Sequence, residues 1–549
     1  MIHFCRFSPA LVLLMLVAAE DSLAQSAADA ARGLDPSLQR ERILRDREYF
    51  EERAAPSEAP SDEPVIVGPA PGGDGSLPET QNVFELKAIR FNESAFIDTA
   101  TLSEIGSKYV GRPVRFADLN EMIGEINAIY AQRGIVSARA LIPAQTIDDG
   151  VLLVRLVEGR LGQLEIEGNG ATRDGFIAGR LPLTPGEVVD VPALRESLTR
   201  LNRTTELSVQ SALRAGSAPG ETDMLLQVDE PPRVSAQVFV DNLGTESTGE
   251  LRGGAILQIY SPLGIDDRLT FYGVGSEGTT NGFVGYRFPF NRSGGRVDVS
   301  YSQGDIEITD GPFVPLDITG DSTSYDVTFT QPFLRGDSLW LDAFAGGSWS
   351  ESNTDISGAA LSEFDVTRYT IGITLHGFTD RSVWSLQQGA SRAESENIFG
   401  DTLDLDIYNG NGSVFYRIDD RWSAQVRGGW QYTSEETVPS PLLFQIGGIS
   451  SVRGYPEGAL AGARGYYVNL EAQHQWREGL SPFAFIDHGL VDDISPDRET
   501  ISSVGLGLAW QYGRYLAGEI SWGHALEEVL PDQDSGRLHA RVTYSWAGL

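Results

Sequence analysis

Apolar and polar residues alternate one by one through much of the last part of the chain, residues 233–549. In Arg537–Trp546, one set of alternate positions holds Leu538, Ala540, Val542, Tyr544 and Trp546, and the other holds Arg537, His539, Arg541, Thr543 and Ser545. Strict alternation predicts β-strands, because successive side chains point to opposite faces. Arg421–Trp430 and Val468–Trp476 repeat the pattern, and turn residues such as Asp380-Arg381 separate the runs. The pattern therefore predicts strands throughout this region.

The apolar face of these strands carries Trp or Tyr near the strand ends, whereas the polar face carries Arg, Glu and Gln in mid-strand. Lipid outside and water inside a transmembrane barrel require this arrangement. At about 20 residues for a strand and its connection, the region accommodates roughly 16 strands. Closure also removes sheet edges, which cannot be satisfied in lipid. We therefore expect a mainly β protein with a transmembrane β-barrel of ~16 strands.

Before the barrel, the periodicity changes and the same order of elements occurs twice, each time in about 75 residues. The first unit has strand Val83–Ile89, helices Thr99–Tyr109 and Phe116–Arg133, and strands Ser137–Pro143 and Val151–Glu158. The second unit has strand Leu161–Glu167, helices Arg173–Gly179 and Val191–Asn202, and strands Glu206–Arg214 and Thr222–Asp229. Each unit is long enough for one small α+β core.

Upstream of the two units, the sequence predicts a helix from about Asp35 to Arg53, with Asp35 as N-cap and Pro36 at the first helical position. Charged residues surround this helix, so it has little apolar face to bury. It belongs in water or in a polar channel, or is unstable alone. The following segment is rich in proline and contains Gly72-Gly73, so we expect a linker without regular structure.

The extreme N-terminus has the pattern of a secretory signal. Arg6 supplies a positive charge, Pro9–Ala19 is a short apolar run, and Ser22-Leu23-Ala24 offers a cleavage site, so the mature chain is expected to start near Gln25. An uncleaved anchor is the alternative. Cys5 is the only cysteine and lies in the removed segment, so a disulfide, thiol chemistry and a Cys-based metal site are not expected.

Charge and motifs exclude several classes of function. The formal net charge of −35 argues against a nucleic-acid partner, because phosphate is repelled by such a surface. The acidic residues are spread along the chain, which fits solubility, although a cation-attracting pore is also allowed. The six histidines are scattered, and neither a His-Glu-x-x-His pair nor a Gly-x-Ser-x-Gly elbow occurs. We expect no enzyme activity, no cofactor and no metal site.

Three motifs add a family resemblance. They are Asp241-Asn242-Leu243-Gly244 followed by Thr248-Gly249, then Val452-Arg453-Gly454-Tyr455, and then Phe485-Ile486-Asp487-His488-Gly489. With the order of helix, linker, two repeats and barrel, the chain resembles the outer-membrane transporters of two-partner secretion, the haemolysin secretion/activation protein family. The repeats resemble polypeptide-transport-associated (POTRA) domains.

The resemblance implies that the loop with Val452, Arg453, Gly454 and Tyr455 folds back into the barrel. Arg453 would meet Asp487 on the inner wall, where Phe485 and Gly489 share the same strand face. An arginine fork can bind a carboxylate with two hydrogen bonds. The plain alternatives are an exposed loop arginine and a solvated acid at a strand end.

The resemblance also implies a function. The charged helix would plug the pore, with a disordered or surface helix as the alternative. The two units would lie in the periplasm and bind a secreted exoprotein partner (TpsA-type) in extended form, at the strand edges near Ser137–Pro143 or Glu206–Arg214. The barrel would contact outer-membrane lipid and translocate the partner to the cell surface.

The expected division is 1–24 signal peptide, 25–55 plug-helix region, 56–82 linker, 83–159 and 160–232 POTRA-like units, and 233–549 barrel. A barrel-assembly insertase is the nearer rival but usually carries more repeats, and a passive porin would need none. One departure from the pattern of such barrels is the ending, where Ala547-Gly548-Leu549 follow Trp546.

Overall fold

The structure is a computed structural model that describes residues 35–54, 66–67 and 83–548, with short gaps at 136, 148, 218–220, 436–437, 493–497 and 531–532. The expected signal peptide, its cleavage site and most of the linker lie outside the described residues. Within the described part, no helix is both long and apolar enough to cross a bilayer.

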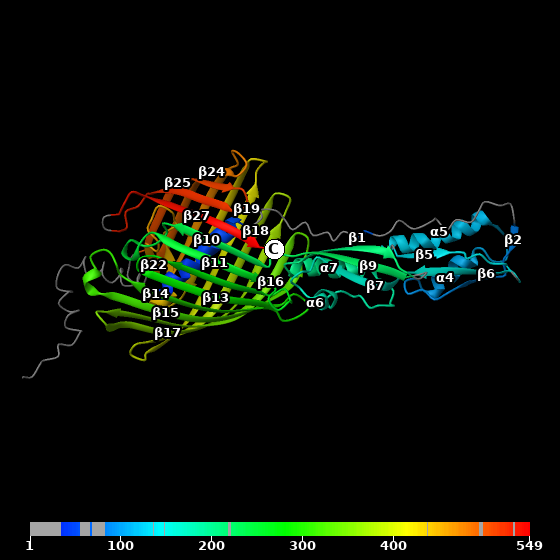
Figure 1. Cartoon of the computed structure of the whole chain (residues 1–549), viewed down its shortest axis with the longest axis horizontal. Helices are drawn as coiled ribbons and strands as arrows, with labels where there is room; N and C mark the ends of the chain where they lie inside the picture. The colour runs from blue at the N-terminus through cyan, green and yellow to red at the C-terminus, as the bar shows by residue number, and fades with distance from the viewer. Residues whose placement is uncertain are drawn as a thin grey trace, which may run out of the picture.

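The barrel is a closed sheet of sixteen described strands in chain order, as the alternation predicted (Figure 1). Each strand is antiparallel to its neighbours, and β10 pairs with β27 through eight residue pairs to close the ring. The strands are β10 (Val234–Asp241), β11 (Arg252–Tyr260), β12 (Arg268–Gly275), β13 (Thr279–Pro289), β14 (Arg296–Glu307), β15 (Ile318–Arg335), β16 (Leu339–Ile356), β17 (Ala359–Phe378), β18 (Ser382–Asn397), β19 (Thr402–Arg417), β20 (Trp422–Thr433), β23 (Arg464–His474), β24 (Leu480–Asp492), β25 (Arg498–Tyr512), β26 (Leu516–Ala525) and β27 (Gly536–Gly548).

Burial along β27 follows the predicted alternation. Val542 and Trp546 are exposed on the outer face, whereas His539 and Arg541 are buried on the inner face. A water-soluble sheet would bury the apolar face instead, so lipid is the environment that this wall fits. Short 3-10 turns lie between strands at η1 (Glu246–Thr248), η2 (Val314–Leu316) and η3 (Ser440–Leu442).

The first unit folds around helix α5, whose apolar face packs on a small sheet. Its elements are β2 (Val83–Glu85), β3 (Ala88–Phe91), α4 (Thr99–Ser107), β4 (Pro113–Arg115), α5 (Phe116–Gln132), β5 (Ala138–Leu141) and β6 (Val151–Glu158). The Asp98 carboxylate accepts the Thr101 N–H and caps α4, and this hydrogen bond lowers the pKa of Asp98. The sheet has three strands in the order β3-β6-β5. Leu119 and Ile126 of α5 are fully buried in the core beside it.

One predicted strand of the first unit is wrong. Val83–Ile89 was expected as a single strand, but Leu86 and Lys87 interrupt it. Leu86 is fully buried, and the Lys87 and Ala88 N–H groups both donate to the Gly150 carbonyl. The halves then join different sheets, because β2 pairs with β4 whereas β3 pairs with β6. Alternation in the sequence continues across such a break and cannot reveal it.

The second unit has the sheet order β1-β8-β9-β7. Its elements are β7 (Arg160–Glu167), α6 (Asp174–Ala178), α7 (Val191–Thr204), β8 (Ser208–Ala215) and β9 (Glu221–Asp229). Leu194, Leu198 and Leu201 of α7 are buried against this sheet. The fourth strand, β1 (Ile66–Val67), comes from the linker. The prediction that proline keeps the whole linker free of regular structure is therefore wrong at these two residues.

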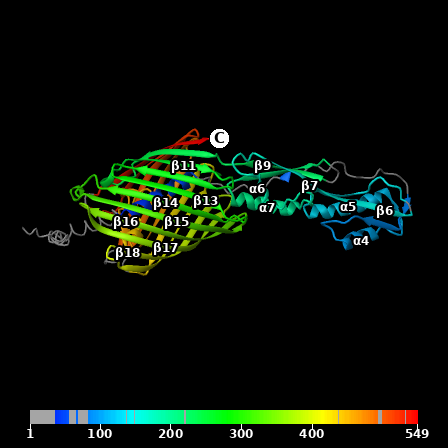
Figure 2. The same cartoon turned by 60° about the horizontal axis from the view of Figure 1, so that its bottom comes forward.

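Helix α3 (Pro36–Ala54) lies inside the barrel, where Figures 1 and 2 both show its dark blue ribbon surrounded by strands. It contacts β14, β15, β16 and η3. Although the helix is highly charged, Leu38, Ile43 and Tyr49 are buried. The barrel lumen thus takes up the few apolar side chains that the helix has.

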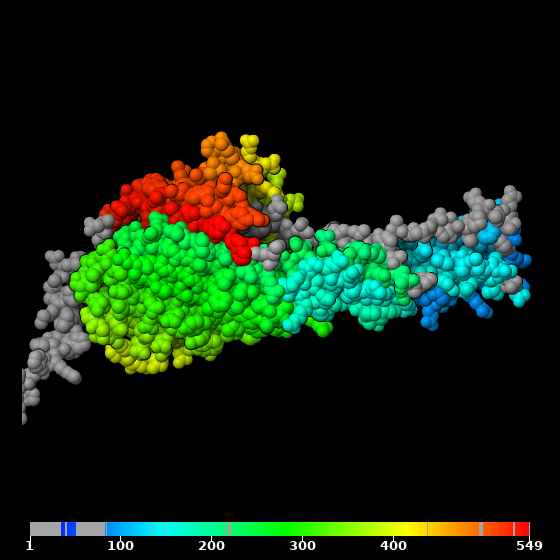
Figure 3. Space-filling view, in the orientation of Figure 1, coloured from blue at the N-terminus to red at the C-terminus, as the bar shows by residue number. Residues whose placement is uncertain are grey.

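The two units form an arm beyond one end of the barrel, with the second unit next to the barrel and the first at the far end (Figure 3). The Arg203 side chain of α7 donates to the carbonyl of Arg335, the last residue of β15, and to Asp337 in the turn that follows. The Thr172 hydroxyl lies 3.2 Å from both the Tyr260 hydroxyl and Ser261 Oγ. The second unit is therefore fixed to the turns at the barrel mouth.

Candidate functional site

The loop between β20 and β23 folds into the barrel. It forms a short hairpin from β21 (Phe444–Ile446) and β22 (Leu460–Gly462). Between the two strands lies the predicted motif, and Val452, Arg453, Gly454 and Tyr455 are all buried. The loop thus presents its tip to the inner wall rather than to the outside.

Arg453 binds the barrel wall through its whole guanidinium group. Its Nε donates to Asp487 Oδ2 at 2.8 Å and its Nη2 to Asp487 Oδ1 at 2.9 Å, while the Arg453 backbone N–H donates to Oδ2 at 3.1 Å. Nη1 donates to Glu471 Oε2 at 2.8 Å. Arg453 is 2% exposed and Asp487 0%. Charge-assisted pairs of this kind are among the stronger hydrogen bonds, and burial removes most of the screening by water.

The other two predicted wall residues frame this pair. The guanidinium carbon of Arg453 lies 3.5 Å from the centre of the Phe485 ring, which places the cation over an aromatic face. Gly489 lies one register step beyond Asp487 on the same face. A Cβ at Gly489 would stand 2.9 Å from Val452 Cγ2 and 3.0 Å from Ile446 Cδ1. A larger residue would not fit at position 489, because the loop occupies the space above it.

The loop tip approaches the last two strands of the barrel at Gly454. Its φ of 91° lies in the left-handed region that favours glycine. A Cβ there would lie 2.9 Å from the carbonyl carbon of Gly523 in β26. The Gly454 N–H donates to Nε2 of His539 in β27 at 3.2 Å. Backbone thus meets backbone at the tip, and neither glycine leaves room for a side chain.

Tyr455 fixes the next turn of the loop to β25 and to the connection after β26. Its hydroxyl lies 3.0 Å from the Ser502 carbonyl and 3.0 Å from Glu527 Oε2, and the Glu527 N–H donates to it at 3.1 Å. The motif therefore contacts β23, β24, β25, β26, β27 and the connection after β26 within four residues. All seven predicted residues come together in one cluster.

Sequence reasoning missed three partners of the loop. Glu471 shares Arg453 with Asp487, His539 accepts the Gly454 N–H, and Asn469 donates to the Ser451 carbonyl. Alternation had already placed Asn469 and Glu471 on the inner face of β23. The strand register shows why these residues reach the loop. Asn469 pairs with Asp487, and Glu471 pairs with Phe485 on the neighbouring strand, so both lie beside the residues that bind Arg453.

Helix α3 adds a second polar cluster in the lumen. Asp46 of the helix lies 3.1 Å from Arg252 Nη2, and Arg252 Nε donates to Asp241 Oδ1 at 2.8 Å. Arg541 of β27 lies 3.8 Å from the same Asp241 carboxylate and stacks over the Phe50 ring. Asp241 belongs to the first predicted motif. The helix therefore meets the seam where β10 and β27 close the barrel.

Other contacts attach α3 to the loop and to the far wall. Arg42 Nη1 donates to the Glu457 carbonyl at 3.1 Å, and Arg45 Nη1 donates to the Gln445 carbonyl at 2.9 Å. At the start of the helix, Asp35 accepts Ser352 Oγ at 2.9 Å. Near its end, the Tyr49 hydroxyl donates to Glu519 at 3.0 Å. Helix and loop thus pack on each other as well as on the wall.

These clusters hold polypeptide segments in place inside the barrel. In the described part of the chain, no group of three or more His, Cys, Asp or Glu side chains could hold a metal ion. The carboxylates face arginine forks and backbone N–H groups. The contacts of this interior therefore hold a loop and a helix against the barrel wall.

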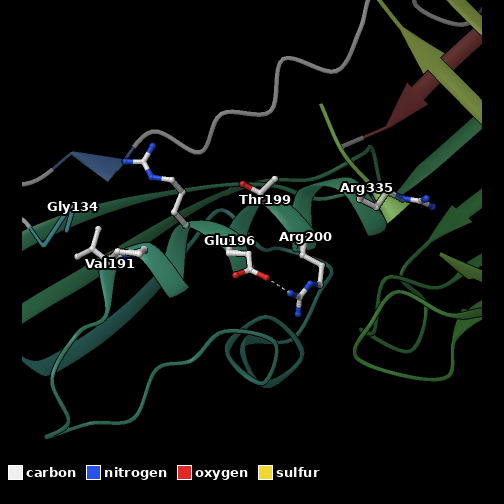
Figure 4. A pocket seen from close by; sticks show the side chains of 8 residues that line it. Gly134, Val191, Glu196, Thr199, Arg200 and Arg335 are labelled. Atoms are coloured by element: carbon white, nitrogen blue, oxygen red, sulfur yellow. Dashed lines mark hydrogen bonds and ion pairs between the residues drawn. The ribbon is translucent and has the colours of Figure 1, made fainter. Parts of the chain in front are cut away.

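A third feature lies outside the barrel. A hollow of about 560 Å³ runs along α7, between Gly134 in the turn after α5 of the first unit and Arg335 at the barrel mouth (Figure 4). Figure 4 also shows the ion pair of 2.7 Å between Arg200 and Glu196. Arg195, Arg200 and Arg335 line the hollow together with Val191 and Pro192. Its lining is therefore basic in a chain whose overall charge is strongly negative.

Comparisons with known proteins agree with this architecture. Residues 220–510 match the family model "Haemolysin secretion/activation protein ShlB/FhaC/HecB", and residues 84–159 match "POTRA domain, ShlB-type". The chain is 23% identical to the outer membrane transporter CdiB of Dickeya dadantii, over 89% of this chain and 91% of that protein. It is 23% identical to the heme/hemopexin transporter protein HuxB of Haemophilus influenzae, over 82% of this chain and 85% of that protein.

The fold also resembles a solved structure of CdiB from Escherichia coli. The TM-score is 0.61 at 19% sequence identity, and the likeness covers 99% of this chain and 100% of the other. At that identity, structural likeness supports the fold, and the family model supplies the assignment. With more than half of its residues in that model, the chain belongs to the haemolysin secretion/activation protein family of outer-membrane transporters.

Proposed function

We propose that this protein is the outer-membrane pore of a two-partner secretion system. It recognises an unfolded exoprotein in the periplasm and translocates it to the cell surface. The observation that carries the proposal is a closed barrel in a member of a secretion family, with an inward loop anchored by Arg453. The relatives CdiB and HuxB are described as transporters.

We infer that Val452, Arg453, Gly454 and Tyr455, with Phe485, Asp487 and Gly489, form the site that sets the loop in its working position. The pairing of Arg453 with Asp487 supports this, because a buried charge without its partner is costly. A loop fixed in this way shapes the lumen through which a partner must pass. The site is thus structural and positions the channel.

Helix α3 is proposed as the plug of the pore. It occupies the lumen, where its charged residues pair with the wall and its few apolar residues are buried. A partner chain cannot share that space with the helix. Transport therefore requires α3 to move, and its contacts must be reversible.

The two units are proposed to capture the partner in extended form in the periplasm. β5 stands at the end of the first unit's sheet, so an extended segment can add to it by strand pairing. The basic hollow beside α7 lies on the route from that unit to the barrel mouth. We retain the expected division of the chain, 1–24, 25–55, 56–82, 83–159, 160–232 and 233–549, as part of this proposal.

A secretion assay tests the function. The chain would be co-expressed with the N-terminal region of an exoprotein encoded next to it, with and without residues 83–231. Export into the medium that requires both the barrel and those residues is the expected result. Absence of export, together with misassembly of other barrels when this chain is depleted, would instead indicate an insertase.

A further inference from the structure

A band of aromatic side chains crosses the outward face of the barrel on β14 to β17. Its members are Tyr301, Tyr325, Trp349 and Tyr369, all of them exposed. On β17, the exposed residue next to Tyr369 on the side of the arm is Ile371, whereas Asp365 is exposed on the other side. Aromatic girdles lie where hydrocarbon meets water. The band therefore marks the edge of the lipid that lies away from the arm, at the outer leaflet.

The band is interrupted on β18, where Ala390 and Arg392 stand at its level. Two rows of register partners cross β17, β18 and β19 here, and they are Tyr369, Arg392 and Asp406, followed by Ile371, Ala390 and Tyr408. Because alanine is small and its neighbours are large, a hollow of about 300 Å³ opens in the outward wall, lined by residues of both rows. The hollow thus faces hydrocarbon along its length and the head-group layer at its outer end.

The outer end of the hollow is polar. The Arg392 guanidinium lies 3.2 Å from Asp404 and 3.8 Å from Asp406, and its side chain is 65% exposed. Exposed ion pairs of this kind are weak, and the planar arginine fork matches the oxygens of a phosphate group, so Arg392 can exchange a carboxylate for phosphate. Among the described outward residues of β14 to β19 at and beyond the band, Arg392 is the only cation. A phosphate in the head-group layer therefore has one residue to bind on this part of the wall.

The carboxylates beside Arg392 restrict what else the head group can carry. Asp404 and Asp406 repel a second anion but accept hydrogen bonds from hydroxyl groups. A phosphate with sugar hydroxyls next to it satisfies both the arginine and the acids. The polar end thus suits a phosphorylated sugar better than the head of a common phospholipid.

We propose that this hollow binds a phosphorylated glycolipid of the outer leaflet. Arg392 binds its phosphate, Asp406 accepts hydroxyl groups of its sugar, and one acyl chain fills the space over Ala390. Inside a bilayer the hydrophobic effect does not favour one position of a chain over another, because all positions are apolar. The fit of the chain between Tyr369 and Tyr408 and the contacts of the head therefore select the lipid. The site lies on the outer wall and is independent of the proposed secretion function.

Native mass spectrometry of the full chain, purified in detergent and titrated with monophosphoryl lipid A, tests the site. The wild type should retain one lipid at low lipid concentration. Ala390→Phe continues the aromatic band across the hollow and should raise the apparent dissociation constant about tenfold. Arg392→Gln keeps the space and removes the cation, so it should raise the constant several-fold. Equal retention by the wild type and both variants would overturn the proposal, because the lipid would then bind anywhere on the wall.

Two matched variants control for the changes in size and charge. Ala472→Phe enlarges an exposed alanine on β23, and Arg514→Gln removes an exposed arginine from the turn between β25 and β26. Both should bind the lipid as the wild type does. All four changes lie on the outward wall or in a turn, and heat-modifiable migration confirms that each barrel has folded. If Ala390→Phe fails to fold, Arg392→Gln decides the outcome.

Two further lipids separate the contacts of the head group. Phosphatidylglycerol carries the phosphate without a sugar, and monogalactosyl diacylglycerol carries a sugar without phosphate. Each should bind the wild type several-fold more weakly than monophosphoryl lipid A does. Equal binding of phosphatidylglycerol would overturn the assignment to a glycolipid, and equal binding of the uncharged glycolipid would overturn the role of Arg392 in holding phosphate.

Discussion

The loop and helix α3 share one lumen but are held in opposite ways. Within the described residues, the buried Asp487 carboxylate accepts hydrogen bonds from Arg453 alone. Loss of Arg453 would leave this charge without a partner. Arg252, which meets Asp46 of the helix, also holds Asp241 at 2.8 Å and keeps that bond when the helix departs. Asp487 of the wall therefore has no other partner in the described part of the chain when Arg453 is lost. Arg252 of the wall, in contrast, still has Asp241 when Asp46 of the helix is lost.

This difference indicates which element is built to stay. A buried ion pair that loses one partner costs about 3–5 kcal/mol, because an uncompensated charge remains. Removal of the helix exposes serine hydroxyls such as Ser352, which water can satisfy, and leaves arginines that retain wall partners. The lumen is thus organised so that the helix can leave at moderate cost while the loop remains anchored.

The largest effect is expected from Arg453→Ala. Asp487 and Glu471 would lose their shared cation in a buried site, so the loop should leave the wall. We expect secretion to fall at least about tenfold, consistent with 3–5 kcal/mol of lost anchoring. Secretion into the medium and heat-modifiable migration of the barrel would be measured together. Arg453→Lys is the control that keeps the charge but loses the fork, and it should restore only part of the activity.

Full secretion by Arg453→Ala in a correctly inserted barrel would contradict the proposal that Arg453 anchors the loop for transport. If both variants fail to insert, the residue serves assembly rather than transport. The insertion assay separates these two outcomes, because an unfolded barrel loses its heat-modifiable band.

The second prediction compares the two carboxylates that share Arg453. Asp487 accepts three N–H groups of Arg453, whereas Glu471 accepts one. Asp487→Asn should therefore reduce secretion several-fold more than Glu471→Gln, with each hydrogen bond to a charged group contributing about 1.5–3 kcal/mol. The two variants remove the same charge from neighbouring strands, so each serves as control for the other. Equal losses would mean that total charge, rather than the fork on Asp487, holds the loop.

Much of this site could be anticipated from the sequence, because the information is local. Alternation places Glu471 and Asn469 on the inner wall, and the resemblance places Asp487 there and joins it to Arg453. Strand register and loop path decide the remainder. His539 is 85 positions from the glycine that it contacts, and Asp46 is 206 positions from Arg252. No periodicity within a strand carries that information.

Two predictions outside the barrel were wrong for the same reason, namely that contacts between distant residues decide the local structure. The break at Leu86 and Lys87 depends on Gly150, whose carbonyl accepts both N–H groups from another part of the first unit. β1 forms where β8 offers a backbone edge, and the β-branched pair Ile66–Val67 is too short a run amid prolines to predict a strand without that partner. In each case a distant partner overrides the local pattern.

The third prediction concerns the whole plug. Deletion of residues 25–53 removes nearly all of α3, so ion conductance in planar bilayers should rise several-fold while the loop stays anchored by Arg453. Secretion should persist, in contrast to Arg453→Ala. The deletion combined with Arg453→Ala is the matched comparison and should conduct without secreting. Unchanged conductance after the deletion would contradict the proposal that α3 blocks the pore.

The smallest effect is expected from Asp46→Asn, which neutralises one helix carboxylate and keeps its shape. Because Arg252 retains Asp241, the helix loses a partner that the wall can replace, and openings should increase by no more than about twofold. Glu41→Gln makes the same charge change at an exposed helix position and serves as the control. A large increase in openings for Asp46→Asn alone would mean that the Asp46–Arg252 pair is itself the latch of the plug. The helix would then be held as the loop is, by one contact without a substitute, and the distinction between the two elements would fail.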